Sequence, residues 1–271
     1  MKLGIVGKGG VGKTTLSSLI CRAYAGRGQR VVAIDTDSNP NLAMSLGLDE
    51  DTANHAPLVP RSLVVGPGSG LTPAELLEQY GLGTPSGVTL LHAMRVEQAG
   101  AGCTCMSHAT VRSLLGMAME EHADVTLVDM EAGLEHLSRA GGTLAHADVL
   151  LMVMEPTRKS IMTAGRTVPL AQELGIPRIY GIGNKARLPA DQLFFEKVAA
   201  EHGVTLAGVV PFDGAVPRAD RRGTPLEAEE ATDVRAAVDA ILDVVDDEDA
   251  HRRALAHQGD RLGRRIAVVE S

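Results

Sequence analysis

The feature that most restricts the fold of this chain is a glycine-rich segment, Gly7-Lys8-Gly9-Gly10-Val11-Gly12-Lys13-Thr14-Thr15. A short apolar run precedes it and a helix-like stretch follows, so it lies between a predicted strand and a predicted helix. This is the context that a phosphate-binding loop requires. Its glycines let backbone N–H groups turn toward phosphate oxygens, while the helix directs its positive end at the same anion.

Individual side chains of this segment have predictable roles. Lys13 should reach the β- and γ-phosphates, and the Thr14 hydroxyl is placed to ligate Mg²⁺. A glycine-rich turn that binds no ligand is the alternative interpretation. The predicted nucleotide-binding residues of the loop are Lys8, Gly9, Gly10, Val11, Gly12, Lys13, Thr14 and Thr15.

A second lysine, Lys8, distinguishes this loop from an ordinary phosphate-binding loop. An ordinary phosphate loop needs one lysine, and Lys8-Gly9-Gly10-Val11-Gly12-Lys13-Thr14 resembles the deviant Walker A motif. That motif marks a superfamily of ParA and MinD partition ATPases, the nitrogenase iron protein and metal-insertion ATPases. The resemblance implies that Lys8 crosses a dimer interface to the partner's nucleotide, and therefore an ATP-dependent homodimer. A solvated loop lysine is the alternative.

Composition supports one α/β domain over residues 1–271. The chain has no Trp, three Tyr and three Phe, so its core must rely on aliphatic side chains, as suits buried parallel strands. A net charge of −8 argues against non-specific binding to nucleic acid. We expect no membrane span and no signal peptide, and the three cysteines do not suggest a disulfide framework. A cytoplasmic location is therefore expected.

Apolar β-branched runs alternate with helical patterns along the chain, which predicts a P-loop NTPase with a mostly parallel sheet flanked by helices on both faces. Residues 49–87 interrupt this rhythm and are expected to form an insertion or loop excursion, with one short helix over 73–80. Residues 246–271 form a tail that is first acidic and then basic, by default a helix docked on its own domain. The predicted strands cover 3–6, 31–34, 88–92, 125–129, 149–154, 179–184 and 206–210, and the predicted helices 15–26, 109–122, 159–174, 191–201 and 227–245.

Acidic residues follow two of these strands, where functional side chains of open α/β sheets gather. Asp35 and Asp37 follow the second strand, and Asp129 ends Val125-Thr126-Leu127-Val128-Asp129 as a Walker B candidate that would hold Mg²⁺ through water. By resemblance to the superfamily, Asp37 would orient or deprotonate the attacking water, Asp35 would assist the Mg²⁺ water shell, and 130–133 would be switch II. An Asx-turn at Asn39-Pro40 is the alternative.

Two later segments resemble the base-binding parts of the same superfamily. Gly183-Asn184-Lys185 ends one predicted strand, and the Asn184 amide matches the group that reads adenine. Pro211-Phe212-Asp213 follows the last strand and would close over the base.

The pair Cys103 and Cys105 points to a soft metal. Thiolates at i and i+2 can ligate one ion but leave a tetrahedral site half empty. A symmetric dimer would supply four thiolates at its two-fold axis. His108 is a weaker candidate ligand, two idle thiols are the alternative, and Cys21 is expected to pack in the core.

The combination of the loop, Asp35-Thr36-Asp37, Cys103-x-Cys105, Val128-Asp129-Met130-Glu131-Ala132-Gly133-Leu134-Glu135-His136 and Glu155-Pro156-Thr157 resembles the CooC family. These are nickel-insertion ATPases of carbon monoxide dehydrogenase maturation. The resemblance implies ATP hydrolysis coupled to dimerisation, Ni²⁺ with Zn²⁺ as a competitor, and carbon monoxide dehydrogenase as the client enzyme. The rival interpretations are a ParA- or MinD-like positioning ATPase, which would bind DNA or membrane, and an iron–sulfur electron-transfer or scaffold ATPase.

Overall fold

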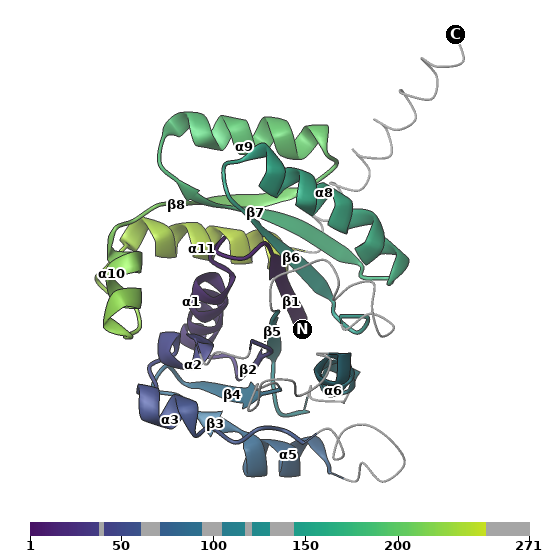
Figure 1. Cartoon of the computed structure of the whole chain (residues 1–271), viewed down its shortest axis with the longest axis vertical. Helices are drawn as coiled ribbons and strands as arrows, with labels where there is room; N and C mark the ends of the chain where they lie inside the picture. Colours follow the sequence, from purple (N-terminus) through teal and green to yellow (C-terminus); the bar gives the residue numbers. More distant parts are fainter. Residues whose placement is uncertain (38–40, 61–70, 94–104, 117–120, 131–143, 248–271) are drawn as a thin grey trace.

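The computed structural model describes residues 1–37, 41–60, 71–93, 105–116, 121–130 and 144–247, and of 105–109 only the backbone (Figure 1). Its centre is an eight-stranded sheet in the order β3-β4-β2-β5-β1-β6-β7-β8. Neighbouring strands pair in parallel except β3, which runs antiparallel to β4. The strands are β1 (Lys2–Gly7), β2 (Val31–Asp35), β3 (Leu82–Gly83), β4 (Val88–His92), β5 (Val125–Asp129), β6 (Val149–Met154), β7 (Arg178–Ala186) and β8 (Leu206–Pro211).

Helices cover both faces of this sheet, which explains why its central strands are almost wholly apolar. Ile5 of β1 faces one hydrophobic cluster, and its neighbour Val6 faces the other. The first cluster takes in α1 (Lys13–Gly26), α2 (Asn41–Ser45), α3 (Glu50–Asn54), α10 (Ala215–Arg222) and α11 (Thr232–Asp246). The second takes in α5 (Pro73–Tyr80), α6 (Cys105–Gly116), α8 (Arg158–Glu173) and α9 (Pro189–Glu201) (Figure 1).

The predicted fold class is confirmed, and every predicted strand is present within two residues of its expected bounds. Two helices differ more. The helix predicted over 109–122 begins at Cys105, and the helix predicted over 227–245 begins only at Thr232. Ala231 explains the late start, since its left-handed backbone (φ 51°) cannot continue a helix. Helices α2 and α10 were not predicted.

The segment 49–87 is more than the loop excursion that its composition suggested. The expected helix is present as α5, where Thr72 and Glu75 form a reciprocal capping box. The segment also contributes α3 and the short strand β3, which extends the sheet beyond β4. Residues 49–87 therefore include an edge of the sheet.

Helix α11 is fastened to α1 by polar contacts at its end. The Tyr24 hydroxyl donates to Asp246 Oδ1 at 2.8 Å, and Arg27 forms ion pairs with Asp239, Asp243 and Asp246. The acidic start of the predicted tail is thus the end of this helix, while residues 248–271 lie outside the described ranges. No helix within those ranges is both long and apolar enough to cross a membrane.

Candidate functional site

Three buried polar side chains form a row across the carboxyl edge of the sheet. Asp35 of β2 is in register with His92 of β4 on one side and with Asp129 of β5 on the other. Each lies two residues after a residue of the α1-side cluster in its own strand, so all three side chains belong to the face that α1 covers. Thr36 links two strand ends, because its hydroxyl donates to the Asp129 carbonyl at 2.8 Å. The predicted acids Asp35 and Asp129 are therefore neighbours.

The predicted phosphate loop connects β1 to α1 at this edge. Gly12 has a left-handed φ of 97°, and a Cβ there would lie 2.5 Å from Asn184 Nδ2, so only glycine suits the position. Lys13 begins α1, is buried, and donates from Nζ to the Lys8 carbonyl at 3.2 Å. Lys8 itself is exposed. The two lysines of the loop thus occupy opposite environments.

Asp129 and Asp35 have the character of a site for a divalent cation. Burial raises the pKa of Asp129 to about 6, although the nearby Thr14 and Ser17 hydroxyls and the Lys13 charge lower it. Burial, followed by the negative charge of Asp129, also raises the pKa of Asp35. Within the described residues, neither oxygen of Asp129 nor Oδ2 of Asp35 has a hydrogen-bond partner. Two adjacent buried carboxylates with so few donors fit Mg²⁺, which would neutralise them.

Asp37 lies just beyond β2 and is half-buried. Its backbone N–H donates to Asp35 Oδ1 at 2.9 Å, so one aspartate fixes the backbone of the other. An Asx-turn is therefore present, but it is formed by Asp35. Asn39 and Pro40, where such a turn was considered, lie outside the described residues, as does the predicted switch II beyond Met130.

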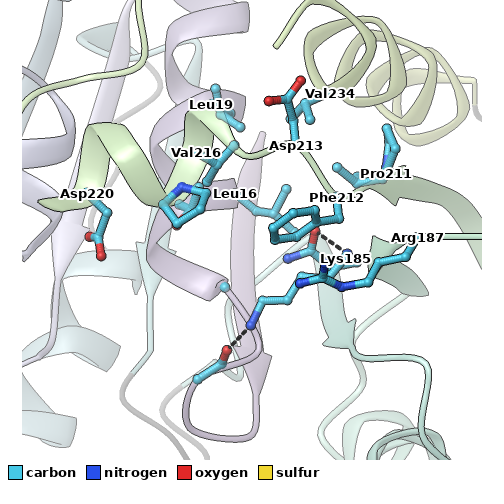
Figure 2. A pocket seen from close by; sticks show the side chains of 16 residues that line it. Leu16, Leu19, Lys185, Arg187, Pro211, Phe212, Asp213, Val216, Asp220 and Val234 are labelled. Atoms are coloured by element: carbon cyan, nitrogen blue, oxygen red, sulfur yellow. Dashed lines mark hydrogen bonds between the residues drawn. The ribbon is translucent and has the colours of Figure 1, made fainter. Parts of the chain in front are cut away.

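A cavity of about 350 Å³ adjoins the phosphate loop and is large enough for a nucleoside (Figure 2). The two segments predicted to bind the base, 184–185 and 211–213, come from different strands and both line it. Apolar side chains complete the wall, among them Leu16 and Leu19 of α1, Val216 of α10 and Val234 of α11.

Some of these side chains make contacts that were not foreseen. Asn184 is buried and donates from Nδ2 to the Val11 carbonyl at 2.8 Å, so its amide already contacts the phosphate loop. Asp213 accepts from the Ala215 N–H at 2.7 Å, which fixes the start of α10. Arg187, which sequence reasoning missed, places its guanidinium carbon 3.6 Å from the centre of the Phe212 ring. No local pattern pairs these two residues, because they follow different strands.

The structure places the predicted metal pair only in part. Cys103 lies outside the described residues, and Cys105 is the first residue of α6, where only the backbone is described. Over the described part of the chain, no group of three or more His, Cys, Asp or Glu side chains is arranged to hold a metal ion. Cys21 is buried in α1, as predicted, and burial raises the pKa of its thiol.

The loop, the acids on adjacent parallel strands and the nucleoside-sized cavity define a P-loop nucleotide-binding protein. Residues 5–226 match the CobQ/CobB/MinD/ParA nucleotide binding domain, so the chain belongs to that family, and it is an ATPase.

Two curated relatives and two solved structures illustrate the match. The carbon monoxide dehydrogenase accessory protein CooC of Rhodospirillum rubrum is 37% identical over 82% of this chain and 88% of its own, which confirms the resemblance to CooC. An uncharacterized ATP-binding protein of Methanocaldococcus jannaschii is 33% identical over 83% of this chain and 91% of its own. MinD of Pyrococcus horikoshii, complexed with Mg-ADP, aligns with a TM-score of 0.67 at 20% identity, covering 90% of this chain and 95% of that one. A ParA family ATPase of Chlorobium tepidum aligns with a TM-score of 0.68 at 21% identity, covering 89% of this chain and 98% of that one. At these identities, both structural alignments support the fold alone.

We expect Lys13→Ala and Asp37→Ala to fail at different steps. Removing the Lys13 ammonium takes the fixed charge from the phosphate cradle, so ATP binding should be lost. Asp37→Ala should still bind ATP but hydrolyse it at least about 100-fold more slowly. Calorimetric titration of ATP and phosphate-release assays would measure the two steps. Near wild-type turnover by Asp37→Ala would contradict the assignment of Asp37.

The buried charge of Asp129 should lower the stability of the nucleotide- and metal-free protein. The pKa of Asp129 is about 6 in the folded protein, which is higher than in the unfolded chain. Ionisation of Asp129 therefore lowers the free energy of unfolding most above pH 6, and it has no effect at pH values below the unfolded pKa. Asp129→Asn should raise the free energy of unfolding by about 2 kcal/mol at pH 8 in EDTA. The gain should shrink as the pH is lowered to 5, and Mg²⁺-dependent hydrolysis should be lost. Denaturant unfolding across this pH range measures the effect.

Asp124 provides a control of opposite sign. It pairs with Arg30 at 2.7 Å, and hydrogen bonds from Arg30 lower its pKa to about 2. Asp124→Asn should therefore reduce stability at neutral pH. A gain for Asp129→Asn that did not change with pH would show that the carboxylate charge is not its source.

Proposed function

We propose that this ATPase is a metallochaperone, in which ATP binding and hydrolysis are coupled to homodimerisation and to the delivery of nickel to carbon monoxide dehydrogenase. The observation that supports this proposal is the position of Cys105 at the start of α6. Strand β4 ends at His92, beside Asp35, and the chain re-enters the described structure at Cys105, the first residue of α6. In a parallel βαβ crossover, a helix begins on the side where the preceding strand ends. The backbone of Cys105 therefore belongs to the edge of the sheet that also carries the predicted Mg²⁺ carboxylates.

The ATP site can be assembled from the described residues. Lys13 would contact the β- and γ-phosphates, and the loop N–H groups would surround them. Thr14, Asp129 and Asp35 would hold Mg²⁺, which neutralises charge on the phosphate oxygens when bound. Asp37 would orient the attacking water and accept its proton. The base would occupy the cavity beside Phe212, and Arg187, whose guanidinium lies over that ring, lines the same cavity.

The metal would be cargo shared between two subunits. One subunit supplies two thiolates from Cys103 and Cys105, which is half of a tetrahedral set. A second copy related by a two-fold axis would supply the other half. Thiolate donors favour nickel or zinc over magnesium or calcium, and similarity to CooC favours nickel.

The exposed lysine of the loop supports the same dimer. Lys13 is buried inside the loop, whereas Lys8 is exposed on its outer side. A cation on the outside of a phosphate loop adds little to nucleotide binding within its own subunit. It is available to the nucleotide of a facing copy.

We expect Lys8→Ala to separate binding from assembly. The variant should bind ATP as a monomer with near wild-type affinity, yet dimerise at least about 10-fold more weakly and hydrolyse slowly, since a charge-assisted contact across the interface is lost. Sedimentation velocity with a non-hydrolysable ATP analogue measures the dimer, and Lys2→Ala, on the strand rather than the loop, is a control. If the variant dimerised and hydrolysed ATP like the wild type, Lys8 would be a solvated loop residue with no role across the interface.

The cysteine pair should bind one metal ion per dimer. Cys103→Ser or Cys105→Ser should remove tight Ni²⁺ or Zn²⁺ binding and weaken the metal-linked dimer, while ATP binding by each monomer persists. Binding should release protons and weaken as the pH falls, because the thiols must ionise. Cys21→Ala, which removes a buried thiol, should leave the metal stoichiometry unchanged. Calorimetry and metal analysis of the purified dimer measure these quantities.

Several results would point elsewhere. One ion per monomer, or unchanged affinity in Cys105→Ser, would contradict a shared site. Brown absorbance after anaerobic purification would favour an iron–sulfur protein. ATP-dependent binding to DNA or lipid vesicles without metal binding would favour a positioning ATPase.

A further inference from the structure

The phosphate loop is contacted by side chains from the last residues of β7, one of which pairs with the residue that follows β6. The Lys185 ammonium donates to the Gly10 carbonyl and to Glu155 Oε1, the latter at 2.8 Å. Asn184, one residue earlier, donates to the Val11 carbonyl at 2.8 Å. Figure 2 shows the Lys185 side chain extending down to the loop, away from Asp213 and Val234. Two consecutive carbonyls of the loop are therefore anchored to one strand end.

Anchoring a carbonyl also orients the next N–H group. A trans peptide is planar, so its C=O and N–H point in opposite directions, and the described residues contain no cis peptide bond. The Gly10 carbonyl shares its peptide with the Val11 N–H, and the Val11 carbonyl shares its peptide with the Gly12 N–H. Holding both carbonyls toward β7 turns both N–H groups to the opposite side of the loop. A phosphate group bound by the loop needs such N–H groups as donors.

The backbone positions of Lys185 and Glu155 are themselves fixed by local contacts. A register irregularity between β7 and β8 falls at 183–186, and Lys185 has a left-handed φ of 61°. That conformation is unfavourable for a residue other than glycine, so it needs compensating contacts such as those of the ammonium. Glu155 is held by α8, because the buried Ser160 Oγ accepts from the Glu155 N–H at 3.1 Å.

From these contacts we propose that Lys185 and Glu155 are a positioning pair that sets the peptide planes of the phosphate loop before nucleotide binds. Lys185 acts through Gly10 on the triphosphate, and the base side of the site has a different cation, Arg187, over the Phe212 ring. This assignment gives Lys185 a role at the phosphate loop in addition to its place in the segment predicted to read the base. It rests on the loop binding ATP, and inorganic tripolyphosphate tests it separately from the metal-delivery function.

Calorimetric titration should compare ATP with inorganic tripolyphosphate, which carries the phosphates without the nucleoside. Lys185→Met keeps a long unbranched side chain at the strained position and removes the ammonium. This substitution should lower the affinity for both ligands by the same factor, about 10-fold, since one charge-assisted contact is lost. The KM for ATP should rise by a similar factor while kcat changes less than about twofold, the signature of uniform binding.

Arg187→Met is the matched control from the other side of the site. It removes a cation of similar size beside the base, so it should weaken ATP and leave tripolyphosphate unchanged. Glu155→Gln should act like Lys185→Met but less strongly, and the double variant should be no weaker than Lys185→Met alone. Lys185→Arg should restore much of the affinity. Lys185 and Glu155 side chains are 38% and 36% exposed, so the variants should fold, as unchanged melting temperatures would verify.

Two outcomes would overturn the proposal. If Lys185→Met lowered the affinity for ATP but not for tripolyphosphate, Lys185 would contact the nucleoside rather than orient the peptide planes of the loop. If it changed neither ligand, or if the effects of Lys185→Met and Glu155→Gln were additive, the two residues would not work as a pair on the loop.

Discussion

The parallel pairing of β1 between β5 and β6 is the constraint on which the site depends. It brings the carboxyl ends of all three strands to one edge, so that the phosphate loop after β1 adjoins Asp129 at the end of β5 and Glu155 after β6. Register matters as much as strand order. A shift of one residue in β5 would move Asp129 to the opposite face, away from α1. Apolar residues alternating on both faces of these strands resist that shift, because it would disturb both hydrophobic clusters.

The same arrangement places uncompensated charge inside the protein. Asp35 and Asp129 are buried side by side, and burial raises the pKa of each. Such a pair lowers the stability of the free protein at neutral pH, and a bound cation would reverse that cost. A cation bound beside these two carboxylates would therefore stabilise the whole domain. The buried Lys13 offers only partial compensation in their absence.

The phosphate site is connected differently to the rest of the sheet on its two flanks. The chain leaves β4 beside Asp35 and re-enters the described structure at Cys105. On the opposite flank, Lys185 and Glu155 fix the loop relative to β6 and β7. One flank of the phosphate site is therefore held by side chains from two strand ends.

The sequence alone determined much of this protein. The phosphate loop follows from a local motif, and the strands and the fold class follow from apolar patterns with the period of strands and helices. The motif and these patterns depend only on residues that are close together in the sequence. Tertiary structure decided the contacts between segments far apart in the chain. It made Asp35 and Asp129 neighbours, stacked Arg187 on Phe212, joined Lys185 to Glu155 and Gly10, and added β3 to the sheet. Those pairings depend on strand order and register, which are set by the burial of whole faces, and no short stretch of sequence records them.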